Sequence, residues 1–408
     1  MMPPMRADDL RPDLSFETLA VHAGQEPDEL TGAVAPPIYQ TSTYAQDGVG
    51  RPRRGYDYAR TVNPTRDRLQ RAVAALEGGG EGIAFASGSA ATAAIAELAA
   101  PSSEIIVGDD VYGGTYRYLE RVRRPNGVEP RFVNLAGNPD ALWEAMTERT
   151  RLVWFETPTN PLLKVIDIAA ASRTVRERWC ERPDPPLVVV DNTFASPVLQ
   201  RPLDLGADIV FHSATKYLAG HSDTVLGIAV TRDPAVAERL RFLQNAMGGV
   251  PGPFDCFLVL RGLRTLHLRI ERHVANARAI AGWLATRDDI EWLVHPGLTT
   301  GAHAHPQTPA CLEQMRGGGS GMVSFRPKAR DGRSAAERAV AVAEATRIFT
   351  LAESLGGVES LIEVPAQMTH LSVAGSPLEV PPDLIRLSVG IESVGDLIAD
   401  LARALDEA

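Results

Sequence analysis

A lysine, a carboxylate and two hydroxyl side chains stand where together they could hold a carbonyl cofactor. Asp191 ends the apolar run PLVVVD, and Lys216 lies in the segment HSATKY beside Ser213 and Thr215. A lysine amine can form a Schiff base with pyridoxal phosphate, while a carboxylate keeps the pyridine nitrogen protonated so that the ring accepts electrons. Ser213 and Thr215, two residues apart on an extended stretch, would point the same way toward the phosphate, with Lys216 on the opposite face. The combination indicates a pyridoxal phosphate site.

Three further segments could complete such a site. Ser87-Gly88-Ser89 follows the run GIAFA and opens a helix, where backbone N–H groups can bind an anion, although a serine that only caps the helix would look the same. Tyr112 follows another apolar run and is succeeded by two glycines, so it could stack on a cofactor ring or lie buried in the core. Arg386 is either a surface arginine or a bidentate clamp for a substrate carboxylate.

Short apolar runs alternate with helical stretches between about residues 61 and 250. The runs predict strands at GIAFA, EIIVG, RLVWFE, PLVVVD and ADIVFH. Because they are apolar on both faces, they predict a mostly parallel sheet covered by helices on each side, and ligands of such sheets bind at the carboxyl ends of the strands. Each of these five runs is followed or ended by polar residues, so we expect the five strand ends to converge on one site.

The composition and periodicity of the chain predict three parts. Residues 1–60 are rich in proline, glycine and charge without sustained periodicity, which indicates an arm. Residues 61–255 form the expected cofactor-binding domain, and residues 256–408 a smaller C-terminal α/β domain. In that last part we expect helices over 258–284 and 335–349, strands at GMVSF and LIRLSVG, and a final helix with one apolar face.

Composition narrows the class of protein. The 408 residues carry a formal net charge of -10 with the signs interspersed, which argues against a nucleic-acid partner and against an anionic membrane surface. The three cysteines are far apart and the histidines lack ligand spacing, so we expect neither a disulfide framework nor a metal site. The chain also has no signal-peptide pattern and no long apolar span. We therefore expect a cytoplasmic protein with a small-molecule partner.

The chain resembles the Cys/Met-metabolism family of pyridoxal phosphate enzymes along nearly all its length. The resemblance implies a fold-type I architecture, with a mostly parallel seven-stranded sheet in the large domain. The segments that carry it are YDYARTVNPTR, VYGGTYRYLE, WFETPTNPLLKVIDI, VVVDNTFASP, HSATKYLAGHSD, LRFLQNAMGGVPGPFDCFL, LAESLGGVESL, AQMTHLSV and IRLSVGIE.

The resemblance also implies roles for individual residues. Lys216 would bind the cofactor covalently, Asp191 would pair with the pyridinium nitrogen, and Tyr112 would stack on the ring and exchange protons with the leaving group. The expected phosphate ligands are Gly88, Ser89, Ser213 and Thr215, joined by Tyr58 and Arg60 from a neighbouring subunit. Asn160 would lie near the ring hydroxyl of the cofactor, and Arg386, helped by Ser354, would bind the substrate carboxylate. A homotetramer built from active dimers follows from the shared site.

Four positions bear on the activity within this family. Val62 and Ser89 depart from the usual glycine and leucine or methionine, and a β-branched residue tolerates positive φ poorly. Gly114 and Glu353 resemble the cystathionine enzymes more than the methionine γ-lyases, and Glu353 could contact the distal amino group of cystathionine. We therefore expect a carbon–sulfur lyase that eliminates the γ-thiol and gives 2-oxobutanoate and ammonia. Cystathionine γ-synthase, methionine γ-lyase and a non-catalytic pyridoxal phosphate-binding protein remain open alternatives.

Overall fold

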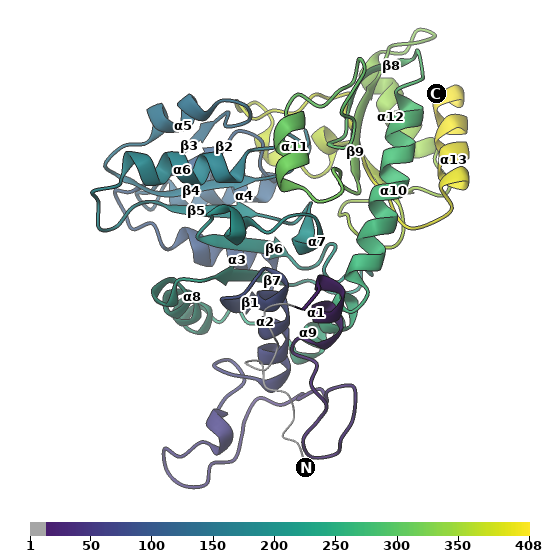
Figure 1. Cartoon of the computed structure of the whole chain (residues 1–408). Coiled ribbons are helices and arrows are strands. Elements are labelled where there is room, and N and C mark those ends of the chain that lie inside the picture. Colours follow the sequence, from purple (N-terminus) through teal and green to yellow (C-terminus); the bar gives the residue numbers. More distant parts are fainter. Residues whose placement is uncertain (1–13) are drawn as a thin grey trace.

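The N-terminal arm is an extended segment with one short helix. The computed structural model describes residues 14–408, so the first 13 residues of the predicted arm lie outside the described part. Helix α1 (Phe16–His22) buries Phe16 and Ala20 in the core beside helix α2 (Pro64–Leu76), and the chain between them projects from the body as loops (Figure 1). The sequence did not predict α1, because seven residues are too few to establish a periodicity.

A seven-stranded, mostly parallel sheet forms the large domain, as predicted. Its strand order is β1-β7-β6-β5-β4-β2-β3, and only β7 runs antiparallel to its neighbours. The bounds are β1 Glu81–Phe85, β2 Glu104–Gly108, β3 Glu129–Val133, β4 Thr150–Glu156, β5 Leu187–Asp191, β6 Ile209–Ser213 and β7 Gly227–Thr231. Five of these strands were predicted. Strands β3 and β7 were missed. Strand β3 lies at the sheet edge, where Glu129, Pro130 and Arg131 are tolerated, so it lacks an apolar run.

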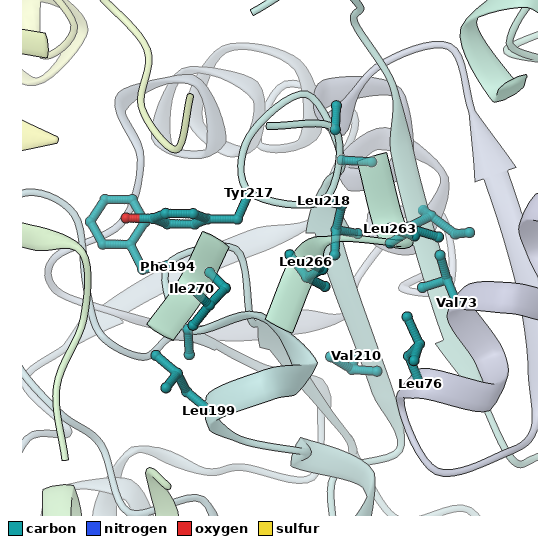
Figure 2. Close-up of a cluster of buried hydrophobic side chains, with 14 of the residues drawn as sticks. Val73, Leu76, Phe194, Leu199, Val210, Tyr217, Leu218, Leu263, Leu266 and Ile270 are labelled. Atoms are coloured by element: carbon teal, nitrogen blue, oxygen red, sulfur yellow. The ribbon is translucent and has the colours of Figure 1, made fainter. Parts of the chain in front are cut away.

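Both faces of this sheet are buried by helices. Alternate strand residues enter one core with α3 (Gly88–Ala96), α4 (Gly113–Tyr118) and α8 (Pro234–Met247). The remaining residues face α2, α5 (Pro139–Ala145), α6 (Ile168–Arg178) and α9 (Pro253–Leu263). Figure 2 shows part of that second face, where Val73 and Leu76 of α2 lie in one cluster with Leu263 and the buried Tyr217. Since Tyr217 is the neighbour of Lys216, this packing fixes the backbone that carries the lysine.

The C-terminal part folds around a second sheet of five strands in the order β10-β11-β12-β9-β8. The strands are β8 Ile290–Val294, β9 Met322–Pro327, β10 Thr350–Leu351, β11 Leu361–Glu363 and β12 Ile385–Ser388. The helices are α10 (Leu266–Leu284), α11 (Thr308–Gln314), α12 (Ala335–Ala345) and α13 (Val394–Glu407). The apolar face predicted for the last helix is buried as expected, through Leu397, Leu401 and Leu405.

Two helix predictions in this region were too long. The segment expected as one helix over 258–284 is divided between α9 and α10, and the expected domain boundary at residues 255/256 falls inside α9. Helix α12 ends at Ala345, not at Phe349, because the buried Asp400 carboxylate accepts the backbone N–H groups of Arg347, Ile348 and Phe349. Those N–H groups are therefore not available to extend the helix.

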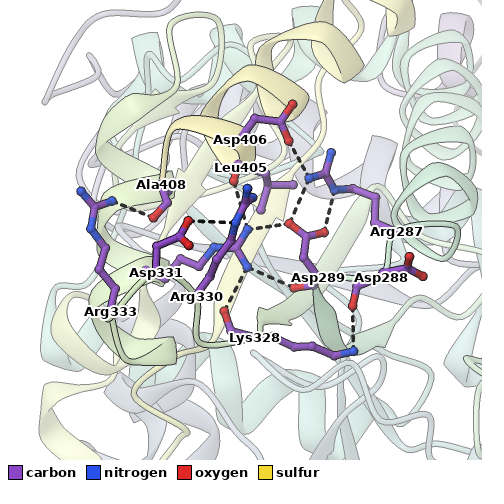
Figure 3. A network of polar contacts seen from close by, with 11 residues as sticks. Arg287, Asp288, Asp289, Lys328, Arg330, Asp331, Arg333, Leu405, Asp406 and Ala408 are labelled. Atoms are coloured by element: carbon purple, nitrogen blue, oxygen red, sulfur yellow. Dashed lines mark hydrogen bonds and ion pairs between the residues drawn. The ribbon is translucent and has the colours of Figure 1, made fainter.

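A polar network connects the last helix to the rest of this domain, and in it Arg287 pairs with Asp406 of α13 at 2.8 Å. Asp289 accepts hydrogen bonds from Arg287 at 2.8 and 2.9 Å and from Arg338 at 2.5 Å (Figure 3). The Arg338 side chain is fully buried and also donates to the carbonyl of Leu405 in α13 at 3.0 Å. Although burial opposes it, hydrogen bonding to Arg287 and Arg338 lowers the pKa of Asp289. No helix within residues 14–408 is long and apolar enough to cross a membrane.

Candidate active site

One cavity of about 290 Å³ collects nearly all the predicted site residues at the carboxyl ends of the central strands. Its volume is close to the lower end of the range for small-molecule sites. The predicted residues that line it are Gly88, Ser89, Tyr112, Asn160, Asp191, Ser213, Thr215, Lys216, Glu353, Ser354 and Arg386. They come from both domains, so the site closes only when the two sheets pack together.

Lys216 follows strand β6 in a tight turn, not on an extended stretch. The strand ends at Ser213, and the Lys216 N–H donates to the Ser213 carbonyl at 3.1 Å. The prediction that Lys216 faces away from Ser213 and Thr215 was therefore wrong, since the turn brings all three to the cavity. The Lys216 Nζ donates to Ser354 Oγ at 2.6 Å. Burial, and secondly the nearby Arg386 guanidinium, lowers the pKa of Lys216 to about 8.

Asp191 presents one unused oxygen to the cavity. Its Oδ1 accepts the Thr193 N–H at 2.9 Å and the Thr193 hydroxyl, whereas its Oδ2 has no hydrogen-bond partner within residues 14–408. Burial raises the pKa of Asp191, and the two bonds from Thr193 oppose that rise. A protonated ring nitrogen would supply the missing partner for Oδ2. Thr193 was missed in the sequence, although an aspartate followed two residues later by threonine is a turn pattern that could have identified it.

The start of helix α3 forms an anion cradle with the end of β6. Ser87 does cap the helix, because its side chain accepts the Ala90 N–H at 3.0 Å. The N–H groups of Gly88 and Ser89 lie at the first two helical positions and have no intrahelical partner. A Cβ on Gly88 would stand 3.0 Å from the Ser213 Cβ, so glycine permits this close approach.

The two hydroxyl groups predicted for the phosphate differ in availability. Thr215 Oγ1 accepts the Leu226 N–H at 3.0 Å and donates to the Leu226 carbonyl at 3.3 Å. The Ser213 hydroxyl has no partner among the described residues. The Ser213 hydroxyl and the N–H groups of Gly88 and Ser89 are therefore the donors available to bind an anion such as a cofactor phosphate.

Tyr112 stands at the cavity with 40% of its surface exposed, so the alternative of a buried core tyrosine is wrong. Its backbone N–H donates to Glu156 Oε1 at 2.6 Å, and its ring lies against Gly114, where an added Cβ would stand 2.3 Å from the Tyr112 Cε1. Glu156 is buried directly beside Asp191 in the sheet, and burial together with the Asp191 charge raises the pKa of Glu156 well above its usual range. Glu156 was recognised in the sequence only as a strand end.

Arg386 is 2% exposed, which rules out the alternative of a surface arginine. Its guanidinium donates to Asn160 Oδ1 at 2.8 Å and to the Ser354 carbonyl at 2.8 Å. The loop that carries Asn160 is held by the buried Asp110, whose Oδ2 accepts the Leu162 N–H at 3.1 Å. A carboxylate that enters the cavity would meet a fixed, desolvated guanidinium.

Tyr58 and Arg60 do not reach this cavity. Both are exposed, and Arg60 Nε donates to Asn245 Oδ1 at 3.1 Å. Their backbone is fixed by the buried Arg66, whose guanidinium donates to the carbonyls of Ala59 at 2.8 Å and of Arg60 at 3.1 Å. Val62 does not adopt a positive φ, so the departure from glycine at that position causes no backbone strain.

The residues of the cavity fit pyridoxal phosphate at each end. The unused Asp191 oxygen suits a pyridinium N–H, the α3 cradle suits a phosphate, and Lys216 lines the same cavity. This site, placed on a mostly parallel sheet with a smaller second domain, defines a pyridoxal phosphate enzyme of fold type I.

Comparison with known proteins identifies the family. The model of the Cys/Met metabolism PLP-dependent enzymes matches residues 17–406, and the chain belongs to that family. It is 52% identical to the cystathionine gamma-synthase of Mycobacterium tuberculosis, an alignment that covers 95% of this chain and 96% of the relative. It is 48% identical to the cystathionine beta-lyase of Coxiella burnetii and to the cystathionine gamma-lyase of Dictyostelium discoideum, and each alignment covers 96% of this chain and 97% of the relative. The crystal structure of metB from Corynebacterium glutamicum superposes with a TM-score of 0.92 at 43% identity, covering 98% of this chain and 100% of that one.

Proposed function

We propose that this enzyme makes or breaks the bond between sulfur and the γ-carbon of cystathionine. The observation that carries the proposal is that Lys216, Tyr112 and Arg386 line one cavity in a chain related along at least 95% of its length to proteins named for cystathionine. When bound, pyridoxal phosphate supplies a sink for the electrons left at the substrate Cα.

The side chains of the chain divide the remaining work. Arg386, oriented by Asn160, binds the substrate carboxylate and so presents the Cα proton to the Lys216 amine. Burial lowers the pKa of that amine to about 8, so more of it is deprotonated near neutral pH than of an ordinary lysine, and the deprotonated amine can accept the proton. Tyr112, half-exposed at the cavity, exchanges a proton with the group that leaves or enters at the γ-carbon. Glu353 is exposed at the cavity and offers a carboxylate to the amino group at the far end of cystathionine.

Elimination and replacement share these steps and differ in what reacts next. The sequence alone favoured elimination, the γ-lyase reaction. The 52% identity to a γ-synthase exceeds the 48% identity to the β- and γ-lyases, and this supports replacement of an O-acyl group by cysteine as the first candidate. Elimination is the second candidate, supported by the γ-lyase relatives at nearly equal identity.

Product analysis separates these reactions. The holoenzyme is incubated separately with L-cystathionine, with L-methionine, and with O-succinyl-L-homoserine plus L-cysteine. New cystathionine with little keto acid supports the synthase, whereas 2-oxobutanoate from cystathionine supports the γ-lyase. Pyruvate from cystathionine would identify a β-lyase, and 2-oxobutanoate chiefly from methionine would identify a methionine γ-lyase. Either of these last two outcomes, or the absence of any product, would contradict the proposal.

We also propose the homotetramer built from active dimers. The support is that Tyr58 and Arg60 are held on an exposed, rigid segment away from the cavity of their own chain. The test mixes inactive Lys216→Ala chains with inactive Arg60→Ala chains under exchange conditions. Partial recovery of turnover is expected if each site takes Arg60 from its neighbour, and no recovery would contradict a shared site.

A further inference from the structure

We propose that Glu363 is the resident counter-ion of Arg386: it orients the guanidinium toward the cavity and takes up one proton when a substrate carboxylate binds there. This inference rests on the proposed function only in that Arg386 is the carboxylate clamp. It does not depend on which sulfur compound is the substrate, because all the candidates carry the same α-carboxylate.

The fold places Glu363 and Arg386 directly opposite each other. They are paired residues of the antiparallel strands β11 and β12, so their side chains project from the same face of the sheet. Glu363 Oε1 lies 3.1 Å from an Arg386 terminal nitrogen and also accepts the Thr369 hydroxyl at 2.8 Å. Arg386 lines the cavity whereas Glu363 does not, so the carboxylate contacts the guanidinium without lining the ligand space.

Burial makes this pair sensitive to a third charge. The Glu363 side chain is 1% exposed and the Arg386 side chain 2% exposed. Glu363 Oε2 and Arg386 Nε have no hydrogen-bond partner among the described residues. In the empty site the two charges compensate each other. A substrate carboxylate would place a second anion on the same guanidinium, and desolvated like charges are costly to hold together.

The other charged groups nearby do not relieve that repulsion. Glu353 adds a negative charge, and in the holoenzyme the Lys216 nitrogen would be occupied by its covalent bond to the cofactor. His370 contacts the same region, but burial lowers its pKa to about 4, so it stays neutral at physiological pH. Burial already raises the pKa of Glu363, with Arg386 opposing the rise. Protonation of Glu363 is thus the available way to admit the substrate carboxylate.

Butanoate, a carboxylate without an amine, isolates this step from the chemistry at the cofactor. Its dissociation constant from the holoenzyme is measured from cofactor absorbance or fluorescence between pH 5.5 and 9, and proton uptake by calorimetry in two buffers of different ionisation enthalpy. We expect uptake of up to one proton and a dissociation constant that rises with pH, by up to about tenfold per unit, until Glu363 stays ionised in the complex. Binding without proton uptake at any pH would overturn the proposal.

Glu363→Gln keeps an oxygen that can accept from Arg386 and Thr369 but cannot titrate. We expect this variant to bind butanoate with no pH dependence, and more tightly than the wild type at high pH. A merely structural role would not produce tighter binding. A pH dependence that persists in Glu363→Gln would overturn the assignment to Glu363.

Glu363→Ala tests the orienting role by comparison with Glu363→Gln, since both lack the charge. We expect the alanine variant to bind butanoate about tenfold more weakly than the glutamine variant, because the guanidinium loses its buried acceptor. Equal affinities would refute the orienting role. Glu104→Gln is the control and should retain the wild-type pH dependence of butanoate binding. Glu104 is a buried carboxylate that pairs with an arginine, and it begins β2 of the large sheet, at the end of that strand away from the cavity. Arg386→Ala tests the clamp itself: unchanged butanoate binding there would refute that part of the proposed function, whatever Glu363 does.

Discussion

Replacing Gly227 with alanine should weaken cofactor binding, although Gly227 does not line the cavity. Gly227 begins β7 between Phe85 of β1 and Ser213 of β6. A Cβ there would lie 2.2 Å from the Ser87 carbonyl oxygen and 2.8 Å from the Gly88 nitrogen. Both atoms belong to the backbone of the anion cradle, so neither can rotate away as a side chain would.

The size of the effect follows from these distances. Relief of the clash to an ordinary contact requires the Ser87–Gly88 turn to move by about 1 Å. A hydrogen bond of about 2.9 Å from an N–H group to the phosphate would then lengthen to about 3.9 Å and be lost. Two such bonds at about 1.5 kcal/mol each amount to about 3 kcal/mol, or about 100-fold in cofactor affinity. The same strain, at about 2 kcal/mol, would lower the Tm of a chain of this length by only about 2 °C. Cofactor affinity is therefore the more sensitive measurement.

The assay titrates apoprotein with pyridoxal phosphate and follows the absorbance of the bound cofactor. We expect the dissociation constant of Gly227→Ala to rise about 100-fold, with turnover partly restored at high cofactor concentration. Gly282→Ala is the matched control, since that glycine lies in α10 with no atom within 4 Å of the added Cβ. A Gly227→Ala dissociation constant within about threefold of the wild type would refute the reasoning that the β7 contact shapes the cradle.

Three further changes test other parts of the structure. The unfolding free energy of the apoprotein, measured by urea titration, should rise between pH 8 and 10.5 by up to about 3 kcal/mol, because over that range the unfolded lysine still binds a proton that the folded Lys216 has released. The variant Lys216→Met should lack this increase. Parallel pH profiles of the two proteins would show that the amine is not desolvated. Tyr112→Phe should reduce kcat about 100-fold or more while cofactor affinity changes little, since the ring remains and only the proton-transfer group is lost; unchanged turnover would exclude Tyr112 as an acid or base. Asp289→Asn should lower the unfolding free energy by about 3 kcal/mol, because the buried Arg338 loses its charged partner, and should leave the cofactor affinity unchanged. The wild type should lose this contribution to the unfolding free energy as pH falls below about 4, since the pKa of Asp289 is lowered on folding.

The sequence predicted the parts of the site that depend on strand ends. Apolar runs are recognisable wherever both faces of a strand are buried, so the run ending at Asp191 and the one ending at His212-Ser213 were placed correctly. The turn that rotates Lys216 toward Ser213 was not predictable from alternation, because alternation holds only while the chain stays extended. The arrangement around Arg386 was only partly accessible, since Glu363 becomes its partner through the register of β11 against β12, which no local pattern specifies.

Neighbouring side chains of the cavity hold the groups that would act on the substrate, and this arrangement would serve either of the two proposed reactions. Thr193 fixes Asp191, and Ser354 holds both Lys216 and Arg386 from a backbone at φ +89°, a conformation that costs about 1–3 kcal/mol in a residue other than glycine. That strain is retained where two reactive groups must be oriented together. Because this framework would position the α-carbon end of the substrate in either proposed reaction, we expect the choice between a proton and a thiol at the γ-carbon to depend on the exposed side of the cavity, where Tyr112 is 40% and Val225 60% accessible. Substitutions at Val225 and Glu353 should therefore shift the ratio of cystathionine to 2-oxobutanoate more than they change the rate at which Lys216 removes the Cα proton.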